Sequence, residues 1–371
     1  MRAIAVLLAW LIVILPTFAT AKEGQAPATG LPFALAQAGA ATDGAKIYVF
    51  GGANGAKDGE PTLTDAILEM DPQTGVVRQL DETLPSPRGG ASAVWDGHEF
   101  LIIGGWAGRD SPLSEIVAFT PGAAPKTLPT RLPLGLSQSA VLWTGAQVLV
   151  FGGYATCGAS CPNATRLVLR YHPDTQVIEE ARAKFPRGFA EQAAVWAGDR
   201  AYLLGGYATE GNASGPTDLI FRYEAATDAL TQLPVKLPEP RSGGAVGNAG
   251  GNAFLLGGTT TSFEPANDVL RFDMQGERGS LTGVSIAVPR VRTFVASAQV
   301  GARVFLIGGA GCPGIVDFCQ EVLVYDVGGG PPAFVARFTP PDVAADRAAP
   351  GFGWPILLVA ALCAVSIRAR R

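Results

Sequence analysis

Two histidines and few charged side chains limit the chemistry open to this 371-residue chain. Charged residues make up 16% of the sequence and the net charge is -4, so a basic surface for nucleic acid is not expected. His98 and His172 both lie at predicted turns. A histidine-based catalytic triad or a multi-histidine metal site is therefore not expected, and no metal or cofactor is predicted.

Long apolar runs are also missing between the two ends of the chain. The sequence holds 47 Gly and 28 Pro, and its aliphatic segments are short and evenly spaced. This composition argues against disorder and favours many short strands joined by turns.

A short aliphatic run that ends in two glycines occurs six times. The copies read KIYVFGG, FLIIGG, VLVFGG, AYLLGG, AFLLGG and VFLIGG, and successive pairs begin 48 to 53 residues apart. A period near 50 in a β-rich chain indicates a propeller, because one blade cannot bury its own faces. We therefore predict an all-β fold, a six-bladed β-propeller with four-stranded antiparallel blades.

The double glycine predicts a strand that turns sharply beside another backbone. Glycine tolerates both the turn and the close approach. A phosphate-binding loop is not expected, since no Lys-Ser/Thr and no helical segment follow the glycines.

The repeat resembles the kelch motif. Each copy has an apolar strand closed by Gly-Gly and then an aromatic or apolar residue near the end of a third strand, and three copies open with an Arg. The match covers about residues 31–339 and implies a kelch propeller. One feature departs from the family: Trp95, Trp143 and Trp196 end the first strand, where kelch repeats carry Trp in the fourth. That departure limits the transfer of function.

Two aligned positions suggest a ligand site at the mouth of the central funnel, where the kelch resemblance places the repeat arginine. Sixteen residues before the first glycine, three copies carry Arg88, Arg241 and Arg292, and two positions later the copies include Gln138 and Glu191. Alternation along a strand puts both positions on one face. We expect these five residues to contact an anionic sugar or an acidic peptide. Alternatively, the arginines pair with carbonyls or carboxylates and tie the blades together.

The resemblance also implies two kinds of enzyme. Galactose oxidase shares the propeller but needs a copper site of tyrosines and histidines, for which this chain has no matching set. Kelch sialic-acid mutarotases need only acid and base groups near the funnel, and Glu191 is the candidate here. Non-catalytic binding is preferred, and a carbohydrate-active enzyme of the mutarotase kind is the alternative.

The first 21 residues predict a secretory signal peptide. Arg2 precedes the apolar run from Ile4 to Ile14, and Ala19-Thr20-Ala21 provides small residues for cleavage. A linker over 22–30, the propeller over 31–339 and a second linker over 340–349 are expected to follow.

Residues 350–371 resemble the PGF-CTERM sorting signal of archaeal surface proteins. Pro350-Gly351-Phe352 precedes the apolar segment from Trp354 to Ile367 and a terminal basic cluster. The resemblance implies cleavage and attachment of a lipid. The alternative is a transmembrane anchor, although the apolar segment is shorter than the roughly 20 residues that a span needs. Both interpretations predict a secreted protein held at the outer face of the cell membrane.

Cysteines and glycosylation motifs lie in the loops that follow the glycine pairs. Cys157 with Cys161 and Cys312 with Cys319 are predicted to form disulfides, as expected outside the cytoplasm. Asn163 and Asn212 are candidate glycosylation sites. The sequence thus predicts a surface-associated kelch-like module that binds a protein, peptide or glycan partner through its funnel and loops.

Overall fold

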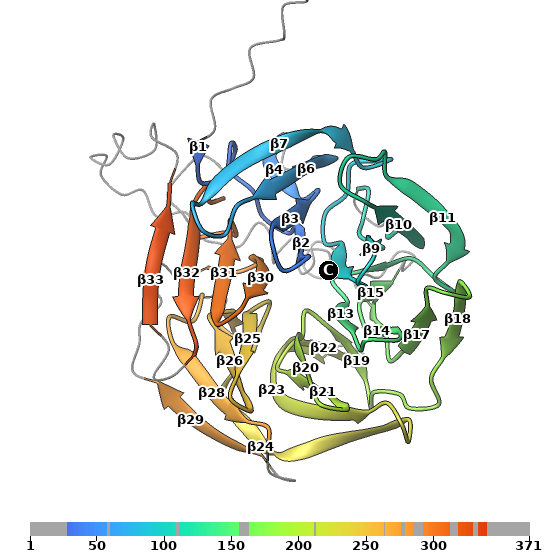
Figure 1. Cartoon of the computed structure of the whole chain (residues 1–371). Coiled ribbons are helices and arrows are strands. Elements are labelled where there is room, and N and C mark those ends of the chain that lie inside the picture. Colours follow the sequence, from blue (N-terminus) through green and yellow to red (C-terminus); the bar gives the residue numbers. More distant parts are fainter. Residues whose placement is uncertain are drawn as a thin grey trace, which may run out of the picture.

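Antiparallel strands form all of the regular secondary structure in the part of the chain that the computed structural model describes. That part comprises residues 28–57, 60–108, 111–155, 163–210, 213–262, 264–275, 279–284, 292–311, 318–328 and 333–339. The strands follow one another around a central axis (Figure 1). Within these ranges no helix is long and apolar enough to cross a membrane. The predicted signal peptide and C-terminal tail lie outside the described residues.

Five of the sheets around the axis contain a four-stranded antiparallel blade with its strands in chain order. The first blade has β2 (Gly39–Thr42), β3 (Ile47–Phe50), β6 (Ala66–Met70) and β7 (Val76–Thr83). The second has β8 (Ser92–Trp95), β9 (Phe100–Ile103), β10 (Glu115–Phe119) and β11 (Lys126–Arg131). The third has β13 (Ala140–Trp143), β14 (Val148–Phe151), β17 (Val168–His172) and β18 (Val177–Glu180). The remaining two are β25 (Ala245–Ala249), β26 (Asn252–Leu256), β28 (Val269–Asp273) and β29 (Ser280–Val284), then β30 (Ala296–Val300), β31 (Arg303–Ile307), β32 (Val322–Asp326) and β33 (Ala333–Phe338).

The prediction of six four-stranded blades is wrong, because the strands between the third blade and β25 belong to one seven-stranded sheet. It contains β19 (Gly188–Ala190), β20 (Ala193–Ala197), β21 (Arg200–Leu204), β22 (Tyr207–Glu210), β23 (Ala213–Glu224), β24 (Ala229–Ser242) and β27 (Thr259–Thr260). β23 and β24 have 12 and 14 residues, whereas the strands of the five blades have four to eight. These two long strands continue past the usual blade edge, so β22 and β27 join the same sheet.

Short strands next to the glycine pairs form a second layer at one end of the ring. β4 (Ala53–Lys57) pairs with β5 (Glu60–Leu63), and β15 (Tyr154–Ala155) lies between β12 (Leu136–Ser137) and β16 (Asn163–Ala164). Isolated bridges such as Gly89 with Trp106 and Thr293 with Ala310 occupy the equivalent place in other copies. The residue that follows each glycine pair is therefore held against the start of an innermost strand.

The ring closes by contact between the two ends of the described chain. Innermost strands are neighbours in the order β2, β8, β13, β20, β25 and β30, and β30 packs beside β2. The Gly309 N–H donates to the Leu35 carbonyl at 2.8 Å. β1 (Ala28–Thr29) adds to β7 at the outer edge of the first blade. The first and last blades are thus each built from one consecutive segment.

Apolar side chains from adjacent blades fill the space between them. All four residues of β3 are buried, and the same holds for β9 and β14, because both faces of these strands meet protein. In one interface Phe50 from the first blade packs against Phe100 and Phe119 from the second, with ring centroids 5.5 and 5.9 Å apart. Burial of such aromatic pairs holds neighbouring blades together.

The glycine pairs lie where neighbouring blades touch, as predicted. Gly104 has φ +60, and a Cβ placed on it would lie 2.1 Å from the carbonyl oxygen of Leu136 in the next copy. Gly308 has φ +63, and its Cβ would lie 2.2 Å from the Leu35 oxygen. Any side chain at these positions would collide with backbone that cannot move away.

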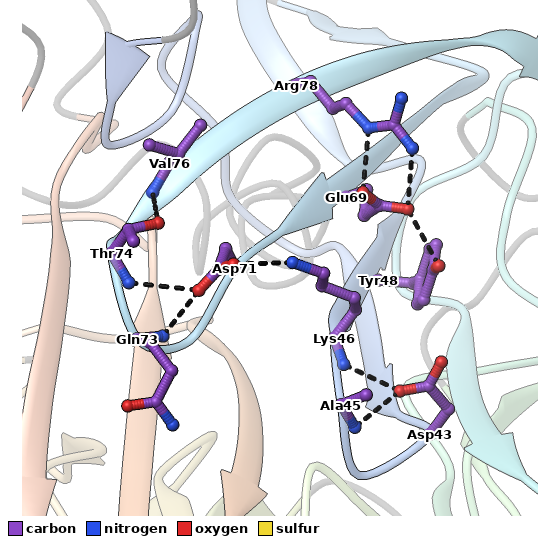
Figure 2. A network of polar contacts seen from close by, with 10 residues as sticks. All are labelled: Asp43, Ala45, Lys46, Tyr48, Glu69, Asp71, Gln73, Thr74, Val76 and Arg78. Atoms are coloured by element: carbon purple, nitrogen blue, oxygen red, sulfur yellow. Dashed lines mark hydrogen bonds and ion pairs between the residues drawn. The ribbon is translucent and has the colours of Figure 1, made fainter.

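Polar side chains cross-link three strands of the first blade (Figure 2). The pairing register sets Tyr48, Glu69 and Arg78 side by side on β3, β6 and β7. Glu69 accepts from the Tyr48 hydroxyl at 2.9 Å and from two Arg78 nitrogens at 2.8 and 3.0 Å. Below them the Lys46 ammonium donates to Asp71 at 2.6 Å. Such cross-strand partners stabilise the sheet locally.

Candidate functional site

A ring of residues with left-handed backbone surrounds one end of the central channel. Its members come from the aligned position two residues after the repeat arginine. They are Gln37 (φ 55), Gly90 (φ 59), Gln138 (φ 52), Glu191 (φ 56), Gly243 (φ 64) and Phe294 (φ 53). Four carry side chains in a conformation that is uncommon for residues other than glycine. Such strain often marks a functional site.

Backbone hydrogen bonds connect the members of this ring from one copy to the next. The N–H of Gln37 donates to the carbonyl of Phe294. Four further hydrogen bonds connect successive ring members in the same way, and the last runs from the Gly243 N–H to the Glu191 carbonyl. The five N···O distances lie between 2.7 and 3.0 Å. Since the links tie each copy to its neighbour, the ring holds its side chains at fixed positions around the axis.

The side chains of the ring line a cavity of about 140 Å³ at the channel mouth. Gln37, Gln138, Glu191 and Phe294 contribute side chains to it. A second cavity of about 290 Å³ is lined by the innermost strands, largely by Ala, Gly and Ser residues. Ser92, Ser139 and Gln192 line both cavities, so the two lie next to each other. The small residues of these strands leave the channel unfilled there.

Glu191 is held in the mouth by two hydroxyl groups. The Tyr154 hydroxyl donates to Oε1 at 2.9 Å and the Ser242 hydroxyl donates to Oε2 at 2.7 Å. Among the described residues no basic side chain makes an ion pair with this carboxylate. Burial raises the pKa of Glu191, and the two hydroxyl hydrogen bonds oppose this rise only in part.

Aromatic residues flank the ring, and our sequence analysis did not identify them. Trp106, Tyr154 and Tyr207 each follow a glycine pair directly. The rings of Tyr154 and Tyr207 lie 6.2 Å apart, and the Trp106 indole packs against Gly90. A sequence signal was available, since an aromatic residue follows Gly-Gly in three copies of the repeat.

Gln192 was missed as well. Its side chain is 7% exposed, and neither its amide nitrogen nor its amide oxygen has a hydrogen-bond partner among the described residues. Buried polar groups of this kind are normally satisfied by protein, water or ligand. Gln192 lines both cavities, but its amide nitrogen and oxygen are covered by the surrounding protein.

The three repeat arginines do not line either cavity. Each is buried, and each pairs with a carboxylate at or just before the start of the third strand of its own copy. The pairs are Arg88 with Glu115 at 2.8 Å, Arg241 with Asp268 at 2.5 Å, and Arg292 with Glu321 at 2.6 Å. Arg88 and Arg292 also donate to the carbonyl of the first glycine of their pair. This geometry matches the structural alternative, in which the arginines tie the fold together.

The other three copies carry apolar residues at both ends of the same contact. In each copy the N–H of the first glycine donates to the carbonyl of the residue just before the part of the third strand that pairs with the second strand. This bond identifies equivalent positions. Where the arginine is replaced, so is the carboxylate: the pairs are Leu35 with Ala66, Leu136 with Leu167, and Phe189 with Leu219. The position therefore holds either an ion pair or apolar residues.

The remaining predicted residues are placed as follows. Gln138 and Glu191 lie in the mouth cavity. Cys319 is fully buried and disulfide-bonded, whereas Cys157, Cys161, Cys312 and Asn212 lie outside the described residues. Asn163 lies in β16, and its side chain is outside the description. No cluster of three or more metal-ligating side chains occurs in the described ranges.

Comparison with known proteins supports a kelch-repeat protein. A "Kelch domain-containing protein" of Archaeoglobus fulgidus is 27% identical over 246 residues, which cover 64% of this chain and 67% of that protein. The "Kelch-like protein terF" of Aspergillus terreus is 26% identical over 237 residues, or 61% of this chain and half of that protein. No protein-family model matches the chain.

A solved structure has the same kind of fold. The chain described as "Structure of YjhT" superposes with a TM-score of 0.67 at 16% identity, and the match covers 83% of this chain and 99% of that one. At this level of identity the likeness concerns the fold alone.

Proposed function

We propose that this kelch-repeat propeller is a binding module that holds a small polar group of a glycan or peptide in the cavity at its channel mouth. The observation that carries the proposal is the fixed ring of Gln37, Gln138 and Glu191 around an unfilled cavity. Ligand sites are typically concave, largely formed in advance, and supplied with a few converging polar groups. The aromatic residues Trp106 and Tyr207 extend the surface available to a larger partner.

The proposal also includes export and attachment to the outer face of the cell membrane. Its supports are the signal-like N-terminus, the PGF-CTERM-like C-terminus and the disulfide bond of Cys319. Structural disulfides are rare in the cytosol and common outside it. Recognition of a protein or glycan at the cell surface fits that location.

Binding is tested with substitutions that the ring itself suggests. Gln138→Gly copies the residue that stands at the equivalent position in two other repeats, Gly90 and Gly243, so it removes a lining side chain without adding backbone strain. Ligands are first identified on glycan and peptide arrays. Isothermal titration calorimetry should then show that this variant binds them at least tenfold more weakly than wild type. Lys126→Ala, an exposed change on β11, is the matched control and should leave affinity unchanged. Equal affinity for wild type and Gln138→Gly would refute binding at the mouth.

A carbohydrate-active enzyme is the second candidate, favoured by the raised pKa of Glu191 in the cavity. A carboxyl group with a raised pKa can hold and release a proton as a general acid or base. NMR exchange spectroscopy of reducing sugars should then show anomer exchange that is accelerated by wild type and at least a hundredfold slower with Glu191→Gln. No acceleration by wild type would remove this candidate.

A further inference from the structure

The charge of the mouth cavity comes from one residue. Glu191 is the one charged side chain among the described residues that line it, and no described lining residue of the second cavity is charged. The three buried arginines nearest in the repeat are already paired with Glu115, Asp268 and Glu321. An anionic ligand would therefore meet a carboxylate without a described basic group beside it.

Among the described residues, two neutral hydroxyl groups donate hydrogen bonds to the Glu191 carboxylate. A partly buried charge that lacks a counter-ion is costly, and pairing with an opposite charge removes much of that cost. A cation that entered the cavity would supply the missing charge. It would also find aromatic surface, because Phe294 lines the cavity. Aromatic faces attract ammonium groups.

The size of the cavity limits the ligand. An apolar cavity of about 150 Å³ accommodates benzene, so the mouth cavity of about 140 Å³ has room for one six-membered ring.

We infer that the channel mouth takes a small ligand of the amino-sugar class, with its ammonium group paired to Glu191. The inference rests on the proposed binding function and names its ligand chemistry. It replaces the expected anionic ligand with a cationic one.

Matched sugars test this inference directly. Isothermal titration calorimetry at pH 7 compares glucose with glucosamine, N-acetylglucosamine and glucuronate, each of which differs from glucose at one substituent. Wild type should bind glucosamine at least tenfold more tightly than the other three. Two other repeats carry glutamine at the equivalent position, as Gln37 and Gln138. Glu191→Gln introduces the same residue and should abolish the preference for glucosamine. Gln138→Gly should keep the preference even if overall affinity falls.

The outcomes separate the inference from the function on which it rests. Equal affinity for glucosamine and glucose, tighter binding of glucuronate, or a preference that survives Glu191→Gln would overturn the cationic ligand but leave binding at the mouth intact. If none of these sugars binds and array hits are also unaffected by Gln138→Gly, both the inference and the proposed function fail.

Discussion

Arg292 and Glu321 form an ion pair that is almost entirely shielded from water. The guanidinium Nη2 lies 2.6 Å from the carboxylate Oε2, and the two side chains are 0% and 2% exposed. Arg292 Nη1 also donates to the carbonyls of Gly308 and Glu321, both at 2.9 Å. The pair thus connects the start of the innermost strand to the glycine turn and the third strand of the same blade.

Removing one member of this pair should destabilise the protein strongly. Arg292→Leu leaves the Glu321 carboxylate buried without its main partner, and losses of about 3–5 kcal/mol are typical of such changes. The double variant Arg292→Leu with Glu321→Leu reproduces the apolar contact of Leu136 and Leu167 in another copy. Urea unfolding should therefore find the double variant more stable than Arg292→Leu alone. This account would be contradicted if the double variant lost as much stability as Arg292→Leu and Glu321→Leu lose together.

Gly104→Ala should lower the free energy of unfolding by more than the left-handed backbone conformation alone explains. Left-handed backbone disfavours a side chain by about 1–2 kcal/mol, and here a Cβ would also lie 2.1 Å from the Leu136 oxygen. Gly301 is the matched control, because its φ is +58 and nothing lies within 4 Å of its Cβ position. Chemical unfolding should show a loss of about 1 kcal/mol for Gly301→Ala and a much larger loss, or failure to fold, for Gly104→Ala. Equal losses would mean that the blade contact can relax.

The Lys46–Asp71 contact should contribute to stability above pH 4 and lose its effect in acid (Figure 2). Hydrogen bonds from the Lys46 ammonium, and then from the Thr74 and Gln73 N–H groups, lower the pKa of Asp71 from 3.8 to about 2. Because the folded pKa lies below the unfolded one, the contribution is complete above about pH 4 and disappears as the pH falls towards 2. Both side chains are about one-third exposed, so we expect about 1 kcal/mol or less. Melting curves of wild type and Asp71→Asn should differ at pH 6 and converge near pH 2; a constant gap would exclude the linkage.

Glu191 should act in the opposite direction. Burial raises the pKa of Glu191, so the folded state favours the neutral carboxyl group. The stability that the neutral form contributes is complete at low pH and is lost as the pH rises through the pKa of the folded state. Glu191→Gln removes the charge and should increase stability at pH 8, by an amount on the order of 1 kcal/mol. The same variant should differ little from wild type below pH 4. A destabilised variant at pH 8 would show that the carboxylate has a compensating partner.

The spacing of the glycine pairs was sufficient to predict an antiparallel β-propeller and the contact of each glycine turn with the next blade. It was not sufficient for the number of four-stranded blades. The number of blades changes because β23 and β24 continue past the usual blade edge. Proline normally ends a strand, but Pro216, Pro234 and Pro238 all lie within these two strands. Tertiary pairing overrides local breakers of this kind.

For the site, alignment of the copies selected Glu191 and Gln138, which line the mouth cavity, but could not assign the arginines. A buried arginine and a ligand-binding arginine look alike in one sequence, and the distinction depends on carboxylates such as Glu115, 27 residues away from Arg88. The apolar replacements at Leu136 and Leu167 carry that information, since the two positions change together.

The links around the channel mouth also constrain when the protein becomes functional. Each joins residues from different repeats, and the bond between Leu35 and Gly309 joins the first repeat to the last. A chain emerging from the ribosome or a translocation pore therefore cannot assemble the mouth until its final repeat has arrived. The proposed binding site is complete only in the finished circle, so a fragment that lacks one repeat should not bind the ligand.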